Sequence, residues 1–143
     1  MPAKGEDSVF GAEDQLTGSL ATVVGGYLLL SAAGVLSRRD AAAHFVESLR
    51  GSPALAHITG AVAFFVGAGL LLVHHRWDAP LEALVSAVAV WWLVEGGAML
   101  ALGPRLLSRA DAPIHFRRMN GLAIPVGLIL LAGGLMHFWS PST

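Results

Sequence analysis

"PALAHITGAVAFFVGAGLLLV", residues 53–73, decides the fold class of this chain. The stretch carries no Asp, Glu, Lys or Arg, and Pro53 opens it directly after Ser52. A helix of roughly 20 apolar residues crosses the hydrocarbon core of a bilayer. Backbone amides in lipid must be paired within their own element, so the stretch predicts a transmembrane helix.

Three further stretches share this length and composition. The predicted spans cover residues 16–36, 53–75, 81–103 and 113–139. The chain is 55% hydrophobic and 13% charged, with a mean hydropathy of +0.64, whereas a soluble domain carries about 25% charged residues. We therefore expect an all-α, integral membrane four-helix bundle. It forms a single membrane domain over residues 1–143, with a polar tail at residues 1–15.

The chain writes one phrase twice. "LSRRDAAAHF" occupies residues 36–45 and "LSRADAPIHF" occupies residues 107–116, with seven of ten positions identical. At the same offset of 71, the glycine pair at 25–26 aligns with the pair at 96–97. A fixed offset predicts an internal repeat, here two tandem helix–connector–helix units. Two spans per unit make the copies parallel, related by an axis along the membrane normal.

The second helices of the two units align less well. Their best match places His75 on His137, at an offset of 62. The first connector predicts an amphipathic helix over residues 40–50, suited to the membrane interface. In this interpretation Asp40 caps that helix, and the repeated phenylalanine enters the bilayer edge. Ser52 before Pro53 is expected to cap the second span.

Arginine distribution predicts the orientation. The connectors at 37–52 and 104–118 contain seven arginines, whereas the opposite side holds Lys4 and Arg76. Short loops rich in Lys and Arg stay in the cytoplasm. We therefore expect a multi-pass protein of the bacterial inner (plasma) membrane, with both termini on the external, periplasmic side.

Glu95 is the most unusual residue of the spans, because it stands well inside the third one. A carboxylate there costs roughly 2.5–3.5 kcal/mol on insertion scales, so such residues usually face a partner or water. One interpretation is a proton or cation site. The other is a protonated or hydrogen-bonded glutamate that joins helices or subunits. We take Glu95 as a candidate intramembrane polar site.

The histidines form two candidate pairs. His44 and His115 match by the repeat, and His75 and His137 stand at the outer ends of the second and fourth spans. Neutral imidazole is a common ligand, so either pair could hold haem. Because all four stand near helix ends, we predict no cofactor and no metal, with haem as the alternative.

Catalytic signatures are missing. The chain has no cysteine, and it contains no P-loop, nucleophile elbow or HExxH motif. We therefore expect no enzyme and no catalytic residues. A net charge of −1 gives no indication of nucleic-acid binding.

The stretch from Glu95 and Gly96 to Pro104 resembles a helix of small bacterial inner-membrane proteins of unknown function. The four-helix layout is similar to that of DoxX-type membrane proteins. The first resemblance implies the inner membrane and supplies no activity.

These observations predict a non-catalytic accessory or interaction subunit of a larger inner-membrane assembly. Its partners are the bilayer and other membrane chains, or further copies of itself. The first alternative is a small oligomeric proton-coupled transporter or channel that uses Glu95. The second is a haem- or quinone-linked redox subunit that uses His75 and His137 or His44 and His115.

Overall fold

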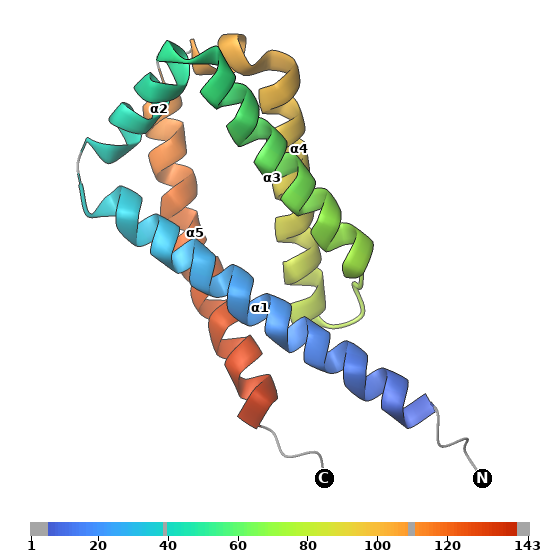
Figure 1. The fold of residues 1–143 in the computed structure, drawn as a ribbon. Helices are drawn as coiled ribbons and strands as arrows, with labels where there is room; N and C mark the ends of the chain where they lie inside the picture. The colour runs from blue at the N-terminus through green and yellow to red at the C-terminus, as the bar shows by residue number, and fades with distance from the viewer. Residues whose placement is uncertain (1–5, 39, 109–110, 140–143) are drawn as a thin grey trace.

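A computed structural model describes residues 6–38, 40–108 and 111–139. Over these residues the chain forms helices and no strand, so the predicted all-α class is confirmed. The helices are α1 (Glu6–Leu36), α2 (Ala41–Gly51), α3 (Pro53–Val73), α4 (Pro80–Leu107) and α5 (Ala112–Trp139), shown in Figure 1.

Four helices are long and apolar enough to cross a membrane. The candidate spans are Asp14–Leu36, Pro53–Val73, Pro80–Gly103 and Ala112–His137. They lie on the four apolar stretches of the sequence, and the chain is a multi-pass membrane protein. Large apolar side chains such as Leu72 and Phe65 are exposed on them, as lipid-facing positions should be.

The long helices pack as two pairs, α1 with α5 and α3 with α4 (Figure 1). We call the end that holds α2 and the α4–α5 turn the connector end, and the opposite end, with the α3–α4 loop, the terminal end. Toward the terminal end the pairs meet in a core of Ala21, Val24, Val85 and Leu130. Toward the connector end the pairs diverge, and α2 lies across the gap (Figure 1).

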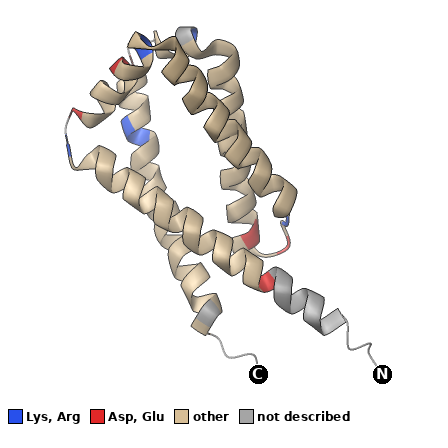
Figure 2. Cartoon of the chain, in the orientation of Figure 1, with Lys and Arg blue, Asp and Glu red and all other residues tan. Residues whose placement is uncertain are grey.

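Charge separates along the same axis. Figure 2 shows Lys and Arg gathered mainly at the connector end, where Arg38, Arg50 and Arg105 stand among the described residues. Arg39 and Arg109 lie outside the described residues. Arg76 stands in the loop at the terminal end.

Glycines set how closely the paired helices approach. A Cβ added at Gly25 of α1 would lie 2.6 Å from the Leu131 amide nitrogen and 2.8 Å from the Gly127 carbonyl oxygen of α5. These distances are too short for any side chain, so backbone packs directly on backbone. Such contacts drive helix association in lipid, where the hydrophobic effect between helices is missing.

The other pair repeats this contact. A Cβ at Gly96 of α4 would collide with the Phe64 amide nitrogen and would lie 2.7 Å from the Gly60 carbonyl oxygen of α3. Gly96 follows Gly25 by 71 residues, whereas Gly60 and Phe64 precede their counterparts Gly127 and Leu131 by 67.

A second contact of each pair obeys the same two offsets. A Cβ at Gly67 would lie 2.7 Å from the Ala89 carbonyl oxygen, and one at Gly134 would lie 2.7 Å from that of Gly18. Gly67 and Gly134 differ by 67 residues, and Gly18 and Ala89 differ by 71. The contacts of the second helices therefore follow an offset of 67. The alignment at 62, which matched His75 with His137, is wrong because the packing glycines do not follow it.

The helix starts agree with the sequence interpretation in part. The Ser52 side chain accepts a hydrogen bond from the Leu55 amide with Pro53 at the first position, so the predicted cap of α3 is confirmed. Asp40 makes no side-chain capping bond, and only its carbonyl accepts from the His44 amide at 2.9 Å. The predicted acidic cap of α2 is therefore wrong. The helical backbone of Asp40 (φ −98°, ψ −4°) explains this, because a capping residue needs an extended conformation.

Candidate functional site

Two neighbouring cavities occupy the connector half, where the helix pairs diverge. The larger, about 660 Å³, is lined by all five helices, and the smaller, about 350 Å³, lies between α2, α4 and α5. Their walls are mostly apolar. Glu95 lines both cavities, so the candidate polar site of the sequence lies where they meet.

The register of α4 directs Glu95 into this space. The next residue, Gly96, packs on the backbone of α3, so Glu95 lies on another side of the helix, which faces α2 and α5. It stands eight residues before Gly103, where the candidate span ends. That separation places the carboxylate about 12 Å inside the span.

The hydrogen bond of Glu95 stays within its own helix. The Trp91 indole Nε1 donates to Glu95 Oε2 at 3.0 Å, one turn earlier along α4. A glutamate that joins helices would take its partner from a neighbour. Here one carboxylate oxygen is oriented by the indole, and the side chain remains exposed to the cavities.

Other titratable groups line the smaller cavity. His115, in the first turn of α5, interacts electrostatically with Glu95. Asp111, just before α5, lines the same space at the connector end. Asp111, His115 and Glu95 thus succeed one another from the membrane boundary into the span. Such a series can pass protons between water and a buried carboxylate.

Aromatic side chains form the walls. Tyr27 of α1 meets Trp92 of α4 edge to face, with ring centroids 5.4 Å apart. Phe45 of α2 stacks on Phe116 of α5, with centroids 4.8 Å apart and planes 19° apart. The expectation that these phenylalanines enter the bilayer edge is wrong, because they contact each other and line the larger cavity.

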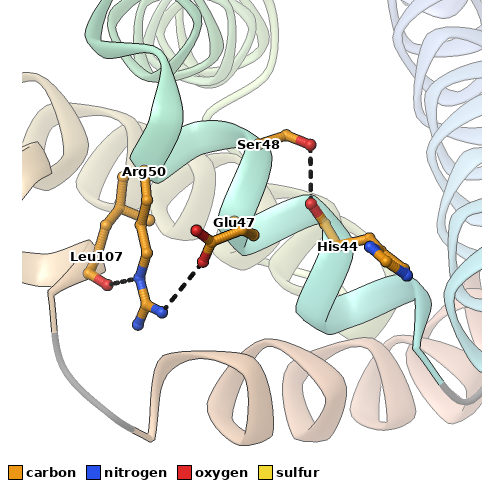
Figure 3. A network of polar contacts seen from close by, with 5 residues as sticks. All are labelled: His44, Glu47, Ser48, Arg50 and Leu107. Atoms are coloured by element: carbon orange, nitrogen blue, oxygen red, sulfur yellow. Dashed lines mark hydrogen bonds and ion pairs between the residues drawn. The ribbon is translucent and has the colours of Figure 1, made fainter.

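Polar contacts hold α2 over the cavities (Figure 3). The Arg50 Nε donates to the Leu107 carbonyl oxygen at the end of α4, and an Arg50 guanidinium nitrogen lies 3.6 Å from Glu47 Oε2. Since the last carbonyls of a helix lack intrahelical donors, the arginine both satisfies α4 and ties α2 to it. The buried face of α2 consists of Ala42, Val46 and Leu49.

The four candidate histidines lie at different places. His115 lines the smaller cavity, whereas His44 is exposed on α2 (Figure 3). His75 stands in the α3–α4 loop, and a Cβ at Gly18 would touch the His137 ring. Over the described part of the chain no hydrogen bond joins the members of either pair. The haem alternative stays a prediction.

A buried polar cluster at the terminal end was missed by sequence reasoning. Glu82, only 5% exposed, lies 3.2 Å from the Arg76 Nε and accepts from the Ala79 amide at 3.3 Å. The fully buried Ser86 donates to the Arg76 carbonyl oxygen at 2.8 Å. Glu82 therefore caps α4 from inside the helix, although the sequence favoured an interfacial position for it.

His74 belongs to the same region. It is 2% exposed, and its Nε2 atom has no hydrogen-bond partner. Burial lowers the pKa of His74 below its ordinary value of 6.5, although the nearby Glu82 carboxylate opposes that shift. The sequence favoured a solvated His74. That expectation is wrong because the α3–α4 loop folds the ring inward, and no sequence pattern reveals such a loop conformation.

No protein family, no curated protein and no solved structure matches this chain. The similarity of Glu95, Gly96 and Pro104 to small inner-membrane proteins, and that of the layout to DoxX-type proteins, stay predictions. Functional argument therefore rests on the cavities and on the residues that line them.

Proposed function

We propose that the chain is a small membrane transporter in which Glu95 binds a proton and couples it to a ligand in the cavities of the connector half. The observation that carries the proposal is the position of Glu95, about 12 Å inside a span and open to two cavities. A carboxylate retained at this depth against its insertion cost is by default a functional group.

The surroundings of Glu95 support a coupling role over a structural one. Its hydrogen bond comes from Trp91 on the same helix, so it does not hold α4 to a neighbour. His115 and Asp111 supply titratable groups between the carboxylate and the connector end. A cavity of about 660 Å³ is of the size that holds a drug-sized ligand.

The test uses proteoliposomes with an imposed pH gradient and an internal pH-sensitive dye. Three aromatic solutes of matched size and different charge are added in turn: N-methylquinolinium, naphthalene-2-sulfonate and 2-naphthamide. We expect at least one of them to collapse the gradient with the wild-type protein and to leave it intact with Glu95→Gln. If none of the three moves protons through the wild type, the proposal is wrong.

An accessory or interaction subunit is the second candidate. Its support is the small amount of chain outside the candidate spans: between them the described chain is limited to α2 and short turns. A protein of this build offers partners mainly its lipid-facing helix surfaces. Purification in mild detergent, followed by identification of stoichiometric copurifying chains, tests this role directly.

We propose the bacterial inner membrane as the location, with the connector end in the cytoplasm. The support is the arginine excess of the two connectors, seven against the two basic residues of the other side. We also propose that the two helix–connector–helix units are copies. The equivalent glycine contacts at offsets of 71 and 67 support this, because unrelated helices have no reason to share them.

A further inference from the structure

The larger cavity combines one carboxylate with aromatic walls. Glu95 is the charged side chain among the described residues that line it, and neither Lys nor Arg joins it there. The aromatic side chains come from α1, α2, α4 and α5 and are Tyr27, Phe45, Trp91, Trp92 and Phe116. A negative group surrounded by aromatic faces favours cations over anions or neutral molecules.

We infer that the ligand of this cavity is an organic cation with an aromatic or otherwise apolar body, bound in exchange for the proton of Glu95. The inference rests on the proposed function and names its substrate class. The ring quadrupoles of the walls attract a delocalised positive charge, and the apolar body fills a space that water would occupy poorly.

Size and donor set distinguish such a cation from a metal ion. A cavity of about 660 Å³ far exceeds what one ion occupies. Over the described residues no group of three or more His, Asp or Glu side chains is placed to hold a metal. The uncharged polar side chains in the cavity, Ser31 and Asn120, engage each other at 3.4 Å. Asn120 also donates to the Phe116 carbonyl oxygen, so these groups orient a wall instead of forming a cage.

One carboxylate cannot satisfy a proton and a cation together. When the cation enters, the Glu95 proton leaves toward His115 and Asp111 at the connector end, and the carboxylate then pairs with the cation. When the cation departs, the proton returns. Charge therefore balances in each half of the cycle, and one proton exchanges for one monovalent cation.

Binding of N-methylquinolinium to the full-length protein in detergent tests the inference, with naphthalene-2-sulfonate as the size-matched anion. We expect the cation to bind and the anion not to bind. In the pH range where Glu95 titrates, the apparent affinity should fall about tenfold for each unit by which the pH drops, because one proton competes. Glu95→Gln should weaken binding by at least about tenfold.

The matched control is Glu47→Gln, which removes an exposed carboxylate of α2 that lines neither of the two cavities. Its affinity for the cation should equal that of the wild type. If Glu95→Gln fails to fold, the wild type alone decides: in weakly buffered solution, cation binding should release up to one proton per chain. Equal binding of the anion, or cation binding without pH dependence, would overturn the inference.

Failure of the inference and failure of the proposed function are distinguishable. If the sulfonate or the amide moves protons in a Glu95-dependent way and the cation does not, Glu95 couples transport but the substrate class is wrong. If no solute moves protons although the cation binds, the site exists and the transport function is wrong.

Discussion

Phe45 and Phe116 stack on each other with ring centroids 4.8 Å apart, and they occupy the same position in the two copies of the repeated phrase. A residue that meets its own counterpart is what a twofold axis produces where it passes through an interface. The stack therefore marks the place where the two units face each other. It also lies in the wall of the larger cavity, so the line that relates the units runs beside the candidate site.

This contact predicts energetic coupling between α2 and α5. Phe45→Ala and Phe116→Ala should each lower the free energy of unfolding, and the double variant should lose less than the sum. The shared stacking energy is about 0.5–1.5 kcal/mol beyond area burial. Denaturant unfolding in detergent for all four proteins of the cycle measures it. Strict additivity would contradict a direct contact.

The glycine pairs predict opposite outcomes at adjacent positions. Gly25→Ala and Gly96→Ala place a methyl group against backbone and should cost about 1–3 kcal/mol or more, because backbone cannot yield as a side chain can. Gly26→Ala is the matched control, since a Cβ there meets nothing within 4 Å. It should be neutral or slightly stabilising. Thermal stability in detergent distinguishes the adjacent positions.

The pairing of the helices predicts that a divided chain reassembles. Each long helix packs most closely on a helix of the other unit, α1 on α5 and α3 on α4. Two coexpressed pieces, residues 1–77 and 78–143, should therefore copurify as a stable complex. Each piece expressed alone should form a homodimer or be degraded, because its closest contacts are missing. A monomeric, stable first piece would contradict this packing.

His74 predicts a stability loss in mild acid. Its pKa is lowered by burial, so the folded protein binds the proton more weakly than the unfolded chain. Stability is therefore complete at higher pH and falls as the pH drops through the ordinary value of 6.5 toward the lowered one. Glu82, Arg76 and His75 are the charged or titratable groups that act on the ring.

The measurement is the thermal midpoint between about pH 7.5 and pH 5.5, the range that brackets an ordinary histidine. His74→Asn should flatten the decline, because it removes the titrating ring and keeps a polar side chain. His44→Asn, on the exposed face of α2, is the control and should leave the slope unchanged. An identical slope in wild type and His74→Asn would show that other groups cause it.

The proposed orientation predicts reporter signals. Green fluorescent protein fused after Thr143 should remain dark, because that end is expected outside the cytoplasm, where the reporter fails to fold. The same reporter fused after Ser108, at the connector end, should fluoresce. Alkaline phosphatase at the two sites should give the reverse pattern. Fluorescence from the Thr143 fusion alone would invert the topology.

The sequence was informative where structure depends on neighbours along the chain. The apolar spans, the amphipathic α2 and the Ser52 cap each depend on a local pattern, so each was predictable. Which helices pair was not, because packing in lipid depends on which face of a glycine-rich helix finds a partner. Gly25 and Gly26 look alike in sequence, yet only Gly25 carries the contact with α5.

The candidate site shows the same division. Glu95 stands out because a charge inside an apolar span is rare. The contribution of Tyr27, Phe45 and Phe116 to the cavity around it was hidden, since they come from three helices far apart in sequence. The cluster of Glu82, Arg76 and Ser86 was hidden for a different reason. Its burial depends on how the α3–α4 loop turns, and the loop has no repeat or periodicity from which to predict its conformation.

The pairing of α1 with α5 determines an order of events during synthesis. α3 and α4 are consecutive, so they meet in the membrane as soon as both have left the translocon. α1 enters first and must keep the glycine face around Gly25 in lipid until α5, the last helix, arrives with Gly127. During that interval an unpaired small-residue face is open to other membrane chains. Release of α5 from the ribosome therefore ends the period in which this protein is most exposed to mispairing and to quality-control proteases.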